Sequence, residues 1–164
     1  MKKLFPILFV LALIPVFVAA TTAQDNKAAL INATKFLETK PFDKTAKDLR
    51  SAAMQYVIET DDVSVTLCSD VLKGVTEKKN KYGSELMAQY AFGMASFKLS
   101  NPEQKDDEAA AQLAGLESML RAYEAMVTEK SNAKYKGVDE LIAKRDKSEL
   151  AAFVEESGCT KSSN

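Results

Sequence analysis

Apolar residues recur at every third or fourth position through most of the chain beyond residue 25, a spacing that is typical of helices with one buried face. The clearest example lies in residues 103–129. Its apolar stripe, at alternating steps of four and three residues, consists of Ala109, Leu113, Leu116, Leu120, Tyr123 and Val127. The pattern predicts one long helix over residues 103–129.

Further segments carry a helical spacing and are separated by residues that stop helices. Pro41 divides the first two, and Asn101-Pro102 ends the fourth, because proline lacks an N–H and restricts the residue before it. The helices expected besides the long one span residues 26–39, 43 or 44 to 58, 62–73, 84–99, 138–145 and 148–156, the last of them capped by Ser148.

Residues 62–73 carry two patterns at once. Val63, Val65 and Leu67 alternate with polar residues, as in a β-strand. Val63, Leu67 and Val71 also keep the i,i+4 spacing of a helix. Because a lone strand would have no partner elsewhere in this chain, the sequence favours a helix here.

The balance of helix formers and helix breakers sets the fold class. Alanine, the best helix former, is abundant beyond residue 23, and only Pro41 and Pro102 interrupt that part of the chain. Consecutive helices with short connections pair as antiparallel hairpins. We therefore expect a single all-α domain over residues 24–159, with six to seven helices in a short α-solenoid or a compact bundle, and a disordered tail at 160–164.

The first 23 residues have the three parts of a secretory signal peptide. Lys2 and Lys3 are followed by an apolar stretch up to Val18 and then by small residues. Cleavage is expected after Ala20 or Ala23, which leaves no stable membrane anchor and places the protein in a periplasm or outside the cell. An uncleaved anchor is the alternative, but about 17 apolar residues interrupted by two prolines make a poor membrane span.

Charge and composition exclude several classes of function. The 164 residues include 22 Lys+Arg, 23 Asp+Glu and no histidine. Without Lys2 and Lys3 the balance is 20 against 23, a net charge of −3, which argues against a nucleic-acid partner. The lack of histidine excludes a Ser-His-Asp triad, a Cys-His pair and every histidine metal site. The paired carboxylates fall mostly at expected helix starts, where capping explains them, so no metal or other cofactor is expected.

Cys68 and Cys159 are the only cysteines. In an exported chain they allow one intramolecular disulfide, which would pin the last helix to the middle of the domain. The alternative is that Cys68 is a small buried residue on an apolar helix face and that Cys159 is a free thiol. A catalytic cysteine is not expected, because no histidine is present to activate a thiolate.

Tyrosines and methionines gather on the fourth and fifth expected helices. The stripe consists of Tyr90, Met94, Tyr123 and Met126, with Met87 and Met119 beside them. Such a stripe usually belongs to a core, and the alternative is a groove for a peptide or an apolar molecule, since methionine-rich surfaces adapt to many partners.

Two stretches resemble halves of a tetratricopeptide repeat. Residues 93–99 are similar to its first helix, and residues 122–126 to its second. The gap between them is too long for the family, no closing proline follows Glu129, and no 34-residue period is present. The resemblance covers about 45 residues and implies helical-hairpin packing with a concave partner surface. As a whole, the chain is similar to small exported bacterial proteins.

These observations favour a non-enzymatic exported protein that acts by binding a protein or peptide partner. A periplasmic carrier of a small apolar or lipid-like ligand is the alternative, and an enzyme of unknown type is the third possibility.

Overall fold

A computed structural model describes residues 18–160, and in this part of the chain all regular structure is helical. The expected leader lies mostly, and the expected disordered tail almost entirely, outside the described residues. The seven α-helices are α1 (Val18–Thr39), α2 (Ala46–Glu59), α3 (Ser69–Leu72), α4 (Gly83–Ser100), α5 (Glu108–Glu129), α6 (Lys136–Asp146) and α7 (Leu150–Glu156). The predicted all-α fold is confirmed, and the helices pack compactly.

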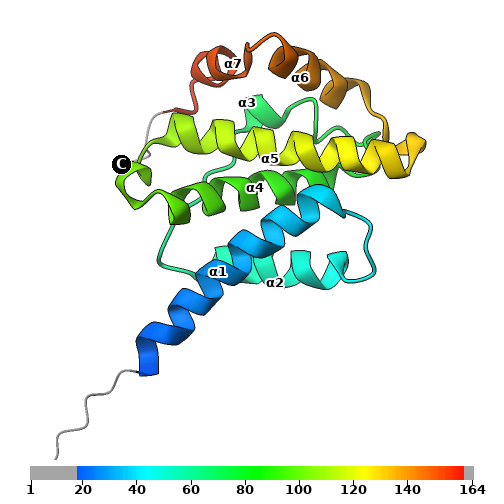
Figure 1. Cartoon of the computed structure of the whole chain (residues 1–164). Coiled ribbons are helices and arrows are strands. Elements are labelled where there is room, and N and C mark those ends of the chain that lie inside the picture. The colour runs from blue at the N-terminus through cyan, green and yellow to red at the C-terminus, as the bar shows by residue number, and fades with distance from the viewer. Residues whose placement is uncertain (1–17, 161–164) are drawn as a thin grey trace, which may run out of the picture.

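Helices α4 and α5 form an antiparallel hairpin at the centre of the molecule (Figure 1). Two glycines let their backbones approach closely. A Cβ atom on Gly93 would lie 2.6 Å from the Cβ of Ser118 and 2.9 Å from the Cα of Gly115, and one on Gly115 would lie 2.8 Å from the carbonyl oxygen of Tyr90. No side chain larger than hydrogen fits between the helices at these points.

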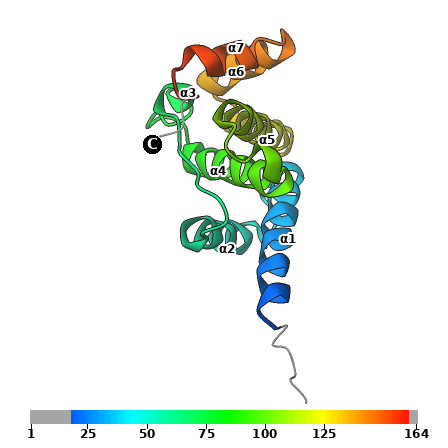
Figure 2. The ribbon, with the colours of Figure 1, turned by 90° about the vertical axis from the view of Figure 1, so that its left-hand side faces the viewer.

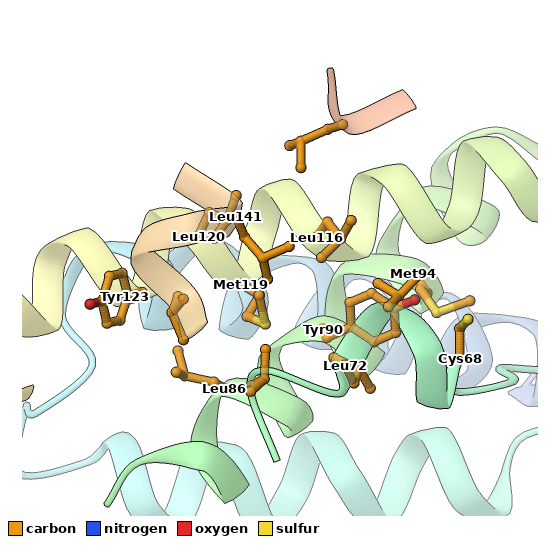
Figure 3. Close-up of a cluster of buried hydrophobic side chains, with 14 of the residues drawn as sticks. Cys68, Leu72, Leu86, Tyr90, Met94, Leu116, Met119, Leu120, Tyr123 and Leu141 are labelled. Carbon is orange, nitrogen blue, oxygen red and sulfur yellow. The ribbon is translucent and has the colours of Figure 1, made fainter. Parts of the chain in front are cut away.

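The other helices cover the two sides of this hairpin (Figure 2). Helices α1 and α2 pack on one side, where Leu30, Leu37 and Phe92 belong to a smaller core. Helices α3, α6 and α7 pack on the other side and enclose a larger core, which includes Leu86, Leu116, Met119 and Leu120 (Figure 3). Every side chain named here is at most 2% exposed.

A hydrogen-bonded network joins α1 to the central hairpin. The Gln89 side chain donates to the Thr34 carbonyl at 3.1 Å and to the Ser118 hydroxyl at 2.9 Å. Ser118 in turn donates to Glu38 at 2.6 Å, and Arg121 makes two bonds of 2.9 Å to the same carboxylate. These bonds satisfy the buried amide of Gln89, which would otherwise be costly to bury.

The helix expected over residues 62–73 is wrong for most of its length. Only Ser69–Leu72 is helical, and residues 60–68, which we call the linker, run as a drawn-out chain from α2 to α3. The side chain of Lys98 donates a hydrogen bond to the carbonyl of Ser64 at 2.8 Å, and the side chain of Gln112 donates one to the carbonyl of Thr66 at 3.0 Å. These side chains hold the linker backbone in place of helical i,i+4 bonds, and the alternating pattern described its conformation better.

Three helix boundaries also differ from expectation. Helix α1 begins at Val18, inside the segment expected to be a leader, rather than at residue 26. The long helix begins at Glu108, because Pro102–Gln104 forms a separate 3-10 turn and Asp107 caps α5 by accepting from the amide of Ala110 at 3.0 Å. Ser148 does not cap α7, since its φ is 60° and the helix starts only at Leu150.

Cys68 and Cys159, which lie 91 positions apart in the sequence, form a disulfide with their Cα atoms 5.8 Å apart. The bond is possible because Cys68 lies at the extended end of the linker and not within a helix. It joins the linker to the chain just beyond α7, and a disulfide is typical of an oxidising compartment outside the cytoplasm. None of the described helices has the length and apolar character needed to cross a membrane.

Candidate functional site

The tyrosine and methionine stripe lies in the core. Tyr90, Met94, Tyr123 and Met126 are each at most 2% exposed, and all four belong to the larger core cluster. Figure 3 shows Tyr90, Met94 and Tyr123 among the leucines of that cluster. The positions correspond to packing, and none of these side chains lines the groove described below.

The hydroxyl group of Tyr123 forms hydrogen bonds inside the protein and is not part of an open surface. Its hydroxyl donates to Asp139 at 2.6 Å and accepts from the backbone amide of Tyr135 at 2.8 Å. Burial, together with the bond to Asp139, raises the pKa of Tyr123 to about 12. The phenol therefore ties α5 to the start of α6 and stays protonated at neutral pH.

A groove of about 570 Å³ lies between α2, the linker and α4, and its lining is largely apolar. We call it the α2–α4 groove. Its size is within the range of cavities that bind drug-sized molecules or peptide side chains. The residues that line it are Met54, Val57, Ile58, Thr60, Asp61, Val63, Ser64, Val65, Leu67, Ser84, Met87, Ala88 and Ala91.

Two large apolar side chains at this groove face solvent. Ile58, at the end of α2, is 74% exposed, and Leu67, in the linker, is 43% exposed. Among the described residues these are the exposed large hydrophobics, and both line the same groove. An exposed apolar side chain is common by itself, but two beside an apolar hollow are typical of an interaction site.

The linker wall of the groove is fixed from behind. Lys98 is only 4% exposed and bonds both to the Ser64 carbonyl and to the carboxylate of Glu108. Gln112 holds the Thr66 carbonyl, and the disulfide holds Cys68 at the end of the linker. The groove is therefore formed before any partner arrives, which reduces the entropy cost of binding.

Negative charge gathers at one end of the groove. Asp61 lines it, and among the described residues no salt bridge engages this carboxylate. The neighbouring Asp62 is paired with Lys27 at 2.9 Å, and the hydrogen bond from that lysine holds the pKa of Asp62 below its usual value. The carboxyl end of the α2 dipole adds partial negative charge near Thr60. This end of the groove therefore suits a cationic group.

A second polar cluster lies behind the linker, between α4 and α5. The Tyr90 hydroxyl and one side-chain oxygen each of Glu108 and Gln112 are buried without a hydrogen-bond partner among the described residues. Burial, and secondarily the charge of Glu108, raises the pKa of the Tyr90 phenol. These polar atoms are buried inside the protein, whereas the groove is open to solvent.

The sequence pattern did not predict the groove, because the linker that forms its main wall was expected to be helical. The signal was present in the alternation of Val63, Val65 and Leu67, which predicts side chains on one face of an extended chain. Ile58 gave no clear signal, because it directly follows Tyr56 and Val57 near the end of α2 and the sequence alone does not show its exposure.

No group of three or more potential metal ligands gathers within the described part of the chain. No protein-family model matches the chain, and neither the curated proteins nor the solved structures include one that is significantly similar to it.

Proposed function

We propose that this protein is an exported, non-enzymatic binding protein that takes an apolar peptide segment of a protein partner into the α2–α4 groove. The observation that carries the proposal is the position of Ile58 and Leu67. Both expose apolar surface to solvent at the rim of a preformed apolar groove. Covering that surface with a partner's apolar side chains removes it from water, which is the main driving force of association.

The shape of the groove favours a peptide over a compact ligand. Its lining comes from three separate elements, α2, the linker and α4, and it opens to solvent rather than forming an enclosed cavity. Asp61 at one end provides a place for a lysine or arginine of the partner. An apolar segment flanked by a basic residue therefore fits the lining.

A carrier of a small apolar or lipid-like molecule is the second candidate, because a volume of about 570 Å³ with an apolar lining also suits such a ligand. The two functions predict different ligands for the same groove, so one variant inside the groove and one control variant outside it test both.

The test is a selection of nine-residue peptides from a displayed random library on the oxidised protein. We expect enrichment of apolar peptides with at least one lysine or arginine. Ala88→Phe places a large ring in the groove and should weaken their binding by about tenfold or more, since a loss of that size corresponds to ~1.4 kcal/mol. The matched control is Ala152→Phe, an exposed position on α7 away from the groove, which should leave binding unchanged.

Peptides that bind Ala88→Phe as well as the unchanged protein would contradict the proposal, as would a selection that enriches no peptide. If dodecanoic acid binds the unchanged protein, Ala88→Phe abolishes that binding, and no peptide is enriched, then the carrier function replaces the peptide function.

A further inference from the structure

We infer that the partner peptide binds as an added β-strand, pairing its backbone with residues 63–67 of the linker while its side chains fill the α2–α4 groove. This inference rests on the proposed function and specifies how the peptide is recognised. It starts from the backbone of the linker, which is extended although no strand of the described chain pairs with it.

The hydrogen bonds of the linker occupy only one of its edges. In an extended chain, successive residues direct their N–H and C=O groups to opposite edges. The carbonyls of Ser64 and Thr66 accept from Lys98 and Gln112, so the backbone edge formed by the even-numbered residues faces α4 and α5. Along the described chain, the backbone groups of Val63, Val65 and Leu67 make no hydrogen bond. These three odd-numbered residues therefore present a free edge.

The free edge faces the groove. Lys98 lies near the carboxyl end of α4, about three helical turns beyond Met87, which lines the groove. The linker lies beside α4 on the side away from α1 (Figure 2). Val63, Val65 and Leu67 line the groove together with Ser84 and Met87 of α4, whereas Thr66 and Lys98 do not. A chain laid in the groove meets this edge directly.

The side chains and charges fit an extended occupant as well. Val63, Val65 and Leu67 all line the groove, so a paired strand would set alternate side chains against them and against Ile58. Five residues at about 3.3 Å each give a pairing length of roughly 16 Å. The carboxylate of Asp61, which forms no salt bridge within the described chain, lines the groove, where a lysine or arginine of the peptide would complement it. Backbone pairing thus supplies affinity, and the groove supplies selectivity.

The fixed position of the linker matters for this mode of binding. An isolated extended segment in solution would lose much of its binding energy in becoming ordered. Here Lys98, Gln112 and the Cys68–Cys159 disulfide hold the segment extended in advance. An exposed, ordered strand edge is a template for pairing with another chain.

The test uses a synthetic heptapeptide in which three valines alternate with two threonines between terminal lysines. Two further versions carry N-methyl groups, one on the valine nitrogens and the other on the threonine nitrogens. A strand pairs through one edge, so we expect one methylated version to lose tenfold or more in affinity by calorimetry and the other to keep most of it. Equal binding of all three versions would overturn strand addition and leave the proposed function standing.

Amide hydrogen exchange of the full chain gives a second readout. On saturation with the heptapeptide, exchange at Val63, Val65 and Leu67 should slow by tenfold or more, and exchange at Ser64 and Thr66 should change much less. Equal changes at all five amides, or no change at any, would contradict pairing through the free edge.

A pair of proline variants provides the matched control. Val65→Pro removes an N–H from the free edge and should abolish binding, whereas Thr66→Pro removes one from the opposite edge and should preserve most of it. Extended backbone accepts proline, and should Val65→Pro fail to fold, the exchange measurement decides alone. If library peptides depend on Ala88 but the heptapeptide does not bind, strand addition is wrong. If no peptide binds at all, the proposed function is wrong too.

Discussion

At the scale of single residues, the least expected feature is Lys98. A lysine 4% exposed is rare unless it is paired, and here its ammonium group donates hydrogen bonds to the Glu108 carboxylate and the Ser64 carbonyl. The apolar stripes of α4 and α5 could be found from the sequence because they repeat with the period of the helix. The pairing of Lys98 with the linker could not, since it joins residues 34 apart that no local pattern connects.

Replacing Lys98 tests its structural role. Lys98→Met leaves Glu108 buried without its partner and removes the hydrogen bond to Ser64, so we expect unfolding to become easier by ~3–5 kcal/mol. The control is Lys136→Met, which breaks an exposed pair with Glu140 and should cost no more than ~0.5 kcal/mol. Chemical denaturation of both variants measures the two free energies. Similar small losses in both would show that the Lys98 pair is not desolvated.

Gly93 gives a prediction of opposite sign to the usual one. In an ordinary helix interior, glycine to alanine stabilises by ~0.5–1 kcal/mol. At Gly93 the new Cβ would lie 2.6 Å from the Cβ of Ser118, so α4 and α5 would have to separate. We expect Gly93→Ala to destabilise the protein by ~1–3 kcal/mol, as overpacked cores do. A rise in Tm by calorimetry would contradict the close helix contact.

At the scale of elements, the linker shows where reasoning from the sequence failed. A helix was predicted over residues 62–73 because a strand there would have no partner strand in the same chain. The linker instead satisfies part of its backbone with side chains of α4 and α5 and ends in a disulfide. The sequence also left open whether Cys68 forms a disulfide with Cys159 or is a buried free cysteine. The choice depended on whether Cys68 lies within a helix, where Cys159 could reach it less easily.

Removing the disulfide should loosen the elements it joins. The loop-entropy relation assigns ~4–5 kcal/mol to a bridge spanning 91 residues. We expect the Cys68→Ser, Cys159→Ser double variant to lose stability of this order, and amides of α7 and α3 to lose hydrogen-exchange protection first. Dithiothreitol should lower the Tm of the unchanged protein and leave the double variant unaffected. An equal Tm with and without the bridge would contradict this role.

At the scale of the whole molecule, the fold class followed from composition, while the functional surface did not. Alanine content and helical spacing were enough to predict an all-α fold of six to seven helices, because each is largely a local property. The α2–α4 groove depends on how α2, the linker and α4 come together, and Ile58 looks like any core residue until its 74% exposure is measured. The tyrosines and methionines chosen from the sequence were sound core residues, since a regular apolar stripe is what a core requires.

The length of chain between Cys68 and Cys159 also determines how long after Cys68 its disulfide partner is synthesised. At about 5–20 residues per second, a ribosome needs roughly 5–20 seconds to add the residues that follow Cys68 up to its partner. Throughout this interval the linker is already made, but Cys159 is not yet present to close the disulfide, and Gln112 is added only about halfway through it. A newly made chain therefore carries an incompletely restrained apolar linker for seconds before its fold is complete, and that is the period in which a chaperone would have the most to protect.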